Sequence, residues 1–327
     1  MRKDSVKSSR EPHVGHGRTV AKVILLGEHS VVYGHPAVAV PLHDLRMTAT
    51  VQPADVPTAP STLRCLDWHG RLEDAPARLA SVVEAVEVAT GFAGRPDTGL
   101  QVTTRADFPA ERGLGSSAAA AGAVVRAVLD AYDVDASPRQ LFDLTQEAER
   151  VAHGHPSGLD ALTTASPVPV YFRDGEGTAL ETDLTAWIVI ADSGVPGSTR
   201  ETVGDVRRRH RTSPEEVGAL LDRLGEIAEG ATGDLRTGDV DALGAKMDRA
   251  HSLLAELGVS DGRLDALTTA ARDAGAVGAK LTGGGRGGCV IALARTGDDA
   301  ARIADSLTDA GAVGTWIHAP HLGKAAP

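Results

Sequence analysis

A loop of glycine and serine leads directly into a run of small apolar residues, and this arrangement constrains the fold more than any other feature. Residues 113–117 read Gly-Leu-Gly-Ser-Ser, and residues 118–132 are mostly alanine, valine and leucine. Serine is a favoured helix N-cap and alanine is the strongest helix former, so the pattern predicts a helix that begins at the loop. The two glycines permit the tight turn that comes before it.

The chemistry of this loop suits a phosphate group. Exposed backbone N–H groups and the positive end of a helix dipole attract anions, and serine hydroxyls can contact phosphate oxygens or Mg²⁺. The loop is not a Walker loop, because the Gly-x-x-x-x-Gly-Lys-Ser/Thr spacing does not occur in the chain. Gly-x-Ser-x-Gly is also missing, which argues against a serine hydrolase. Taken alone, the loop is better explained as a serine cap with two glycines that allow a tight turn.

Length and charge limit the classes of protein that remain. The 327 residues are enough for two domains, and the formal net charge is −11. This charge argues against binding of nucleic acid or an anionic membrane by a basic surface, so an anionic ligand needs a local site. Cys65 and Cys289 lie far apart and form no disulfide framework or thiolate zinc site, which fits a cytoplasmic protein. Residues 1–18 are expected to be a flexible tail with no signal peptide or membrane span.

The order of expected elements favours an α+β layered fold over a doubly wound one. A domain boundary is expected within 190–212, which gives an N-terminal domain at 19–195 and a C-terminal domain at 196–327. Strands are expected at 19–26, 37–51, 61–68, 98–106, 168–172 and 186–191, and helices at 75–90, 118–132, 138–152 and 157–165. Three consecutive helices are expected at 213–229, 239–257 and 260–273, followed by a strand, a glycine loop, a strand, a helix and a last strand that ends at His318.

A second segment places charged residues at the end of the first expected strand. Lys22 lies among apolar residues, and Gly27, Glu28 and His29 follow in a turn. The chain has only 6 lysines against 27 arginines, and Lys22 and Lys280 are the two that lie within apolar segments. A lysine in such a place needs an anionic partner. The alternative is an edge lysine, a turn glycine and a surface histidine.

The third segment gathers two carboxylates and two histidines where one helix ends and another begins. It contains Glu149, His153, His155 and Asp160. Two histidines two residues apart do not fit the usual zinc pair at i and i+4. Ser157 and Asp160 have the spacing of a capping box, which is compatible with a catalytic role for Asp160.

The fourth segment is a glycine loop between two expected strands. It runs from Lys280 through Gly283, Gly285 and Gly288 to Cys289, and these glycines formally match a dinucleotide-binding fingerprint. The context does not fit such a site, because a strand and not a helix follows the glycines. The glycines are better explained by a close approach of the backbone to something bulky or to the other domain.

Together and in this order, the four segments resemble the GHMP small-molecule kinases. The match spans about residues 19–295, and the opening pattern Lys-Val-Ile-Leu-x-Gly-Glu-His-x-Val-Val-x-Gly is most similar to members that act on mevalonate. The resemblance implies an N-terminal domain like ribosomal protein S5 domain 2 and a ferredoxin-like C-terminal domain. It also implies phosphorylation of the 5-hydroxyl of mevalonate with ATP and Mg²⁺, in a cytoplasmic protein that could form a homodimer. The alternatives are a phosphomevalonate, homoserine or galactose kinase, or a catalytically silent binding protein.

The same resemblance assigns roles to individual residues. Asp160 would be the base near the reacting hydroxyl, with Lys22 beside it. Ser117 and Glu149 would hold Mg²⁺. The ATP phosphates would be bound by Gly113, Leu114, Gly115, Ser116, Ser117 and Ala118. The mevalonate pocket would include Glu28, His29, Thr199 and Arg200, and the planar guanidinium of Arg200 matches a carboxylate.

Two residues depart from the family pattern. Ala161 follows Asp160 where the family usually has asparagine, and Arg286 stands in the last glycine loop where glycine is usual. The first change puts the side-chain support of Asp160 in doubt. The second either stiffens the loop or brings a cation near the site.

Overall fold

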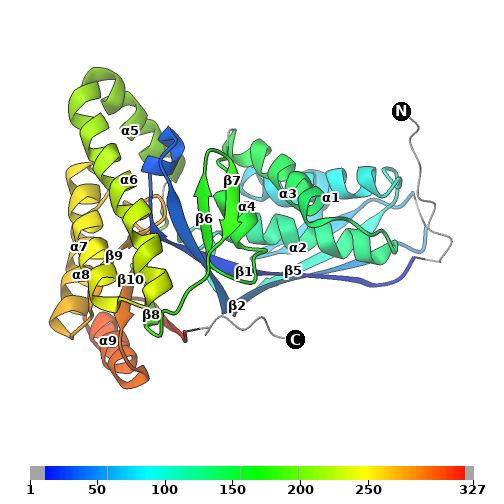
Figure 1. Cartoon of the computed structure of the whole chain (residues 1–327). Coiled ribbons are helices and arrows are strands. Elements are labelled where there is room, and N and C mark those ends of the chain that lie inside the picture. The colour runs from blue at the N-terminus through cyan, green and yellow to red at the C-terminus, as the bar shows by residue number, and fades with distance from the viewer. Residues whose placement is uncertain (1–11, 57, 155, 198, 321–327) are drawn as a thin grey trace. The chain divides into compact units, whose positions relative to one another are not determined.

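The structure is a computed structural model that describes residues 12–320, except Pro57, His155 and Ser198 and the side chain of His153 (Figure 1). The chain divides into two compact units that are interleaved in sequence. The first unit comprises the described residues up to Ala21, together with Leu45–Phe108 and Ser116–Ala165. The second unit comprises Lys22–Asp44, Pro109–Gly115 and the described residues from Ser166 onward.

Two long strands, β1 (Gly15–Leu26) and β2 (Ala37–Pro53), pair with each other and contribute residues to both units. The remaining elements of the first unit are β3 (Thr62–Cys65), β4 (Trp68–Arg71), the 3₁₀ turns η2 (Leu72–Asp74) and η3 (Ala77–Leu79), α1 (Ala80–Phe92), β5 (Leu100–Ala106), α2 (Ser116–Ala131), α3 (Pro138–His153) and α4 (Leu159–Thr163). Those of the second unit are η1 (Ser30–Tyr33), β6 (Val170–Arg173), β7 (Glu176–Ala179), β8 (Trp187–Asp192), α5 (Thr199–Thr212), α6 (Pro214–Thr237), α7 (Val240–Glu256), α8 (Gly262–Asp273), β9 (Gly278–Thr282), β10 (Cys289–Ala294), α9 (Gly297–Asp309) and β11 (Gly314–His318).

Each unit has its own strand pairing. In the first unit, the C-terminal half of β2 pairs antiparallel with β5, β5 pairs parallel with β3, and β3 forms a hairpin with β4. In the second unit, the N-terminal end of β2 pairs with β6, which forms a hairpin with β7. A separate antiparallel sheet of the second unit has the strand order β11-β8-β10-β9, and α8 and α9 pack on it.

The small residues of α2 let β1 pack directly on the helix backbone. A Cβ atom added at Gly17 would lie 1.9 Å from the carbonyl oxygen of Ala123, and one added at Gly15 would lie 2.1 Å from that of Ala127. Most residues of α2 are buried, and α1, α2 and α3 pack against one another (Figure 1). The glycines of β1 and the alanines of α2 therefore set the position of the helix that begins at Ser116.

Helices α7 and α8 close the outer edge of β9. The backbone N–H of Ala279 donates to Asp248 at 2.9 Å, and its carbonyl accepts from Arg272 at 2.7 Å. The N–H of Leu281 donates to Nδ1 of His251 at 3.3 Å. An open sheet edge invites pairing with other chains, so these side chains protect the strand and hold it in place.

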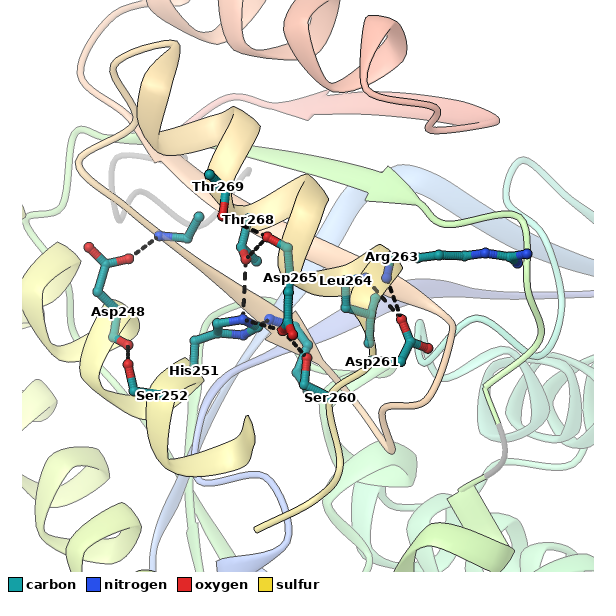
Figure 2. Close-up of polar contacts among 12 residues, drawn as sticks. Asp248, His251, Ser252, Ser260, Asp261, Arg263, Leu264, Asp265, Thr268 and Thr269 are labelled. Carbon is teal, nitrogen blue, oxygen red and sulfur yellow. Dashed lines mark hydrogen bonds and ion pairs between the residues drawn. The ribbon is translucent and has the colours of Figure 1, made fainter. Parts of the chain in front are cut away.

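His251 also joins α7 to α8 (Figure 2). Burial lowers its pKa. Because Nδ1 accepts from the backbone, Nε2 carries the proton, and it lies 3.2 Å from both Asp265 Oδ1 and Thr268 Oγ1. Ser260 donates its hydroxyl proton to Asp265 at 2.6 Å and not to the histidine. The cluster therefore lacks the serine–histidine bond of a nucleophilic serine and serves to join the two helices.

The expected elements are largely present, and the α+β prediction is confirmed, with some differences. The tail predicted at 1–18 is too long, because β1 begins at Gly15. Helix α5 was missed, and the expected capping box between Ser157 and Asp160 is wrong, because Gly158 is the N-cap of α4 and Ser157 Oγ accepts from Leu159 N. The consecutive domains expected at 19–195 and 196–327 stay a prediction. The two compact units of the structure are interleaved in sequence and do not share that boundary. In the described part of the chain, none of the helices is long and apolar enough to span a membrane.

The contact between β1 and α2 predicts that Gly17→Ala destabilises the protein. The new methyl group would meet backbone atoms of α2, and overpacking of a core costs roughly 1–3 kcal/mol. Urea unfolding measures the loss. Gly233→Ala is the control, because nothing lies within 4 Å of that position in α6, and alanine should be neutral or stabilising there. An unchanged free energy of unfolding for Gly17→Ala would contradict the packing described.

Candidate active site

The phosphate-loop residues Pro109–Gly115 belong to the second unit and are held there by several contacts. The N–H of Lys22 donates to the carbonyl of Leu114 at 3.0 Å, and Arg112 forms an ion pair with Asp192 at 2.9 Å. The N–H of Gly197 donates to the carbonyl of Glu111 at 2.9 Å. The loop is therefore fixed before it enters α2 at Ser116.

The glycine loop after β9 packs against this phosphate loop. A Cβ atom added at Gly113 would lie 2.8 Å from the carbonyl oxygen of Thr282, and one added at Gly283 would lie 2.8 Å from Cα of Gly113. Both glycines also have positive φ, 78° and 85°. The close backbone approach expected from the sequence is confirmed, and its partner is the backbone of the other glycine loop.

Lys22 lies at the point where β1 reaches the phosphate loop. Its side chain is 2% exposed, and Nζ donates to the carbonyl of Gly113 at 3.3 Å. Burial raises the pKa of Glu28 and lowers that of Lys280, and the pairing of the two residues opposes both shifts. The positive charge of Lys22 makes a smaller contribution to both pKa values, which favours the charged form of Glu28 and the neutral form of Lys280. The cation is therefore placed beside the loop that is expected to hold phosphates.

Glu28 forms a buried ion pair with Lys280. Their side chains are 1% and 0% exposed, and Lys280 Nζ donates to Glu28 Oε1 and, at 2.6 Å, to the carbonyl of Leu281. Burial raises the pKa of the Glu28 carboxyl, and the ammonium of Lys280 opposes this shift. Oε2 of Glu28 has no hydrogen-bond partner among the described residues. The charge of Glu28 is thus already matched within the protein.

His29 is held as a neutral imidazole. It is a non-glycine residue with φ of 62°, and its Nε2 lies 3.0 Å from the carbonyl of Gly284. Burial lowers its pKa to about 4, so the ring is uncharged at neutral pH. Because the carbonyl only accepts, Nε2 carries the proton and Nδ1 is left as an acceptor. A neutral ring cannot provide the positive charge that a carboxylate ligand requires.

Thr199 and Arg200 form the start of α5 in the same unit. A Cβ atom added at Gly284 would lie 2.6 Å from Thr199 Oγ1, so Gly284 adjoins both Thr199 and His29. Arg200 is exposed in the first turn of α5. Contacts within the second unit therefore link Lys22 to the phosphate loop and His29 and Thr199 to Gly284, while Arg200 is placed only at the exposed start of α5.

Arg286 stiffens the last glycine loop. It has φ of 51°, its Nε donates to the carbonyl of Gly258 at 3.1 Å, and its guanidinium forms an ion pair with Asp205 of α5. Its backbone N–H donates to the carbonyl of Val259 at 2.9 Å. These contacts support the stiffer loop. The other explanation, a cation near the site, is supported as well, because the charge of Arg286 contributes, after the larger effect of burial, to the lowered pKa of His29.

The first unit joins the two residues expected to hold Mg²⁺. Ser117 lies in the first turn of α2, and its hydroxyl donates to Glu149 Oε1 of α3 at 2.6 Å. Glu149 is 4% exposed, and Ser81 Oγ of α1 lies 3.1 Å from Ser117 Oγ. Ser116 is half-buried, and the neighbouring Ala118 is buried.

Asp160 lies in α4, which packs against α2 and α3. The N-cap of this short helix is Gly158 at φ of 98°, where a Cβ atom would lie 3.1 Å from the Phe142 ring. The segment before it is tied to α3, because Gln146 Nε2 donates to the carbonyl of Pro156 at 2.9 Å. The side chain of Ala161 is buried. The hypothesis of histidine ligands at 153 and 155 lies outside the described side chains.

The oxygen donors of the Ser117–Glu149 pair fit Mg²⁺. Mg²⁺ prefers oxygen ligands and is often bound by one or two carboxylates together with the phosphates of a nucleotide. A buried carboxylate in contact with a hydroxyl at the start of a long helix provides such donors. Among the described residues, no cluster of three or more histidine, cysteine or acidic side chains is arranged to hold a metal ion.

Sequence reasoning missed two residues at these sites and the partner of a third. Lys280 was noted as a lysine among apolar residues, but its partner Glu28 lies 252 positions away. Arg112 was passed over within the phosphate loop, where it pairs with Asp192. Ser81 lies in none of the four motifs. The one signal in the sequence is that it is a serine within a largely apolar helix.

The buried pair predicts that Lys280→Met strongly destabilises the protein. Removal of one partner leaves an uncompensated buried charge, which typically costs about 3–5 kcal/mol. The double variant Lys280→Met with Glu28→Gln removes both charges and should recover much of this loss. Urea unfolding of the wild type, both single variants and the double variant measures the coupling. A double variant no more stable than Lys280→Met alone would contradict a mutual pairing.

Comparison with known proteins gives a consistent result. The family model described as the GHMP kinases N terminal domain matches residues 78–166, and the model described as GHMP kinases C terminal matches residues 231–313. The mevalonate kinase of Pyrococcus abyssi is 35% identical over 294 residues, covering 84% of this chain and 87% of the relative. That of Thermococcus onnurineus is 33% identical over 311 residues, covering 89% and 92%.

Solved structures agree with the sequence relatives. L. major mevalonate kinase, solved in complex with R-mevalonate, has a TM-score of 0.81 at 25% identity and covers 98% of this chain and 99% of that one. Mevalonate kinase from Staphylococcus aureus has a TM-score of 0.73 at 28% identity, with 94% and 98% covered. The motifs, the two-domain fold and these relatives lead to one conclusion: the chain belongs to the GHMP kinases and, within them, to the mevalonate kinase family.

Proposed function

We propose that the protein transfers the terminal phosphoryl group of ATP to the 5-hydroxyl of mevalonate. The observation that carries this proposal is the bond between Ser117 and the buried Glu149 at the start of α2, in a chain whose relatives are mevalonate kinases. Phosphoryl transfer mainly requires positioning and neutralisation of the triphosphate charge. The helix start and its oxygen donors suit both requirements.

The triphosphate is bound by the loop and the beginning of α2. The backbone of Gly113, Leu114 and Gly115 and the residues Ser116, Ser117 and Ala118 offer N–H groups at the positive end of the helix dipole. Ser117 and Glu149 hold Mg²⁺, which when bound neutralises charge on the phosphate oxygens. Because the loop is fixed by Lys22, Arg112 and Gly283, it loses little conformational freedom when ATP binds.

Asp160 accepts the proton of the reacting hydroxyl, and Lys22 stabilises the negative charge that develops on the alcohol oxygen. The position of Lys22 at the phosphate loop, where Nζ contacts the carbonyl of Gly113, supports this role. A loose transition state makes an early and complete proton transfer unnecessary, so Asp160 also acts by orienting the hydroxyl.

Mevalonate is bound by residues of the second unit. Arg200 pairs with the carboxylate, because its planar guanidinium matches a carboxylate with two hydrogen bonds. His29 presents Nδ1 as an acceptor for a substrate hydroxyl, and Thr199 adjoins Gly284, whose carbonyl His29 contacts. Glu28 contributes through its bond to Lys280, which holds the turn that carries His29.

A panel of alcohols tests the proposed substrate. Purified protein is incubated with ATP and Mg²⁺ and with mevalonate, phosphomevalonate, homoserine or galactose, and the product is identified by phosphorus NMR. A phosphate monoester formed from mevalonate supports the proposal. Turnover of another alcohol in preference to mevalonate would assign the protein to a different activity of the GHMP kinases. Turnover of none would favour a binding protein. The cytoplasmic location and the homodimer stay predictions.

The role of Asp160 predicts that Asp160→Asn lowers kcat about 10²- to 10⁴-fold, the usual contribution of a general base. Binding of ATP should be unchanged, because the phosphate loop is intact. Asp273→Asn, at an exposed position at the end of α8, is the control and should keep full activity. Near-normal turnover by Asp160→Asn would reject Asp160 as the base.

The role of Arg200 predicts that Arg200→Ala chiefly raises KM for mevalonate. Loss of the charged partner of a bound carboxylate costs about 2 kcal/mol or more, which corresponds to roughly a 30-fold increase. KM for ATP should stay the same. Arg207→Ala removes an exposed arginine from the same helix and should change neither value. A normal KM for mevalonate in Arg200→Ala would exclude Arg200 from the pocket.

A further inference from the structure

Three helices of the first unit bring side-chain oxygens together at one point. Ser81 comes from the first turn of α1, Ser117 from the first turn of α2, and Glu149 from the last part of α3. Ser117 Oγ lies 2.6 Å from Glu149 Oε1 and 3.1 Å from Ser81 Oγ. Ser81 lies outside the four motifs that define the family resemblance.

The protons of this group can be assigned from the two distances. A serine hydroxyl has one proton and two lone pairs, and a carboxylate only accepts. The short bond to Glu149 therefore uses the proton of Ser117. The contact with Ser81 must then be donated by Ser81, whose proton occupies one lone pair of Ser117 Oγ.

Because Ser81 is buried, its hydrogen bond to Ser117 contributes to the stability of the fold. Ser81 is 3% exposed, and the neighbouring Val82 and Ala85 are also buried. A buried hydroxyl destabilises a protein unless a hydrogen bond compensates for the lost water. Ser117 provides that compensation, so the rotamers of the two serines are coupled.

We propose that Ser81 is a positioning residue of the Mg²⁺ site, an inference that rests on the proposed function. Ser117 Oγ has four directions, of which one is the bond to Cβ, one is the proton given to Glu149, and one is the lone pair that accepts from Ser81. The fourth direction is the remaining lone pair. Ser81 and Glu149 together fix the side chain so that this lone pair has one orientation, which is the one offered to the metal.

Such support is a general feature of metal sites. Side chains that orient a metal ligand without touching the metal typically change affinity 10- to 100-fold when they are removed. Ser81 acts in this way through Ser117. It is expected to influence binding of the metal–nucleotide complex and not binding of mevalonate, because it acts through Ser117 and, in the described part of the chain, its side chain forms no hydrogen bond with the residues proposed to bind mevalonate.

Ser81→Ala tests the proposal, with Mn²⁺ and a non-hydrolysable ATP analogue as probes. Electron paramagnetic resonance measures free Mn²⁺ and gives the affinity without turnover. We expect wild-type protein with the analogue to bind Mn²⁺, and Ser81→Ala to bind it about 10- to 100-fold more weakly. Ser81→Thr retains the hydroxyl and should restore most of the affinity. Thermal unfolding without nucleotide checks that each variant is folded.

Thr90→Val is the matched control. Thr90 is a buried hydroxyl on the same helix, and it donates to the carbonyls of Val86 and Glu87 and not to a residue of the site. This variant should bind Mn²⁺ like the wild type. A wild-type affinity in folded Ser81→Ala would overturn the role of Ser81 and leave the proposed function intact. If the wild type itself binds no Mn²⁺ with the analogue, the metal assignment to Ser117 and Glu149 fails, and the role of Ser81 fails with it.

Discussion

The ion pair between Glu28 and Lys280 is the interaction on which the second unit's part of the site depends. Both side chains are fully enclosed, and they connect the turn after β1 with strand β9. The turn carries His29 in a backbone conformation that non-glycine residues seldom adopt, and its ring bonds to the glycine loop that follows β9. Strained backbone of this kind persists only where its surroundings determine it. The charge pair and the bond to Gly284 supply that constraint from two sides.

Glycines perform a different task in each unit. In the second unit, Gly113 and Gly283 let two loops meet backbone to backbone, so the phosphate loop rests on the loop after β9. In the first unit, the glycines of β1 let the strand lie against α2, whose first turn carries Ser117. The boundary between the two units falls within the glycine and serine segment, because Gly115 belongs to the second unit and Ser116 to the first.

Local sequence patterns predicted those features of the fold that depend only on residues close together in the chain. Helix α3 has a proline in its first turn and a capping box between Ser137 and Gln140, and its start was predicted correctly. Helix α5 buries only Thr202 and Val206 and is otherwise rich in arginine, so it lacks the apolar stripe that would reveal it. The motifs identified Ser117 and Glu149, which the structure joins. They could not identify the partners of Lys280 and Ser117 on distant elements, because such pairings are decided by tertiary packing. The interleaving of the two units is hidden for the same reason.

The contact between β1 and α2 also limits how this sequence can diverge. An atom added at Gly17 would collide with a main-chain carbonyl oxygen, which is present whatever residue occupies position 123. A smaller neighbour therefore cannot compensate for a larger residue at position 17, as it can when two side chains compete for space. Second-site suppressors of such a change would have to shift a whole helix, and that helix begins at Ser116, which we propose contacts the ATP phosphates. Evolution is thus expected to retain glycine there even in lineages where the surrounding apolar residues exchange freely.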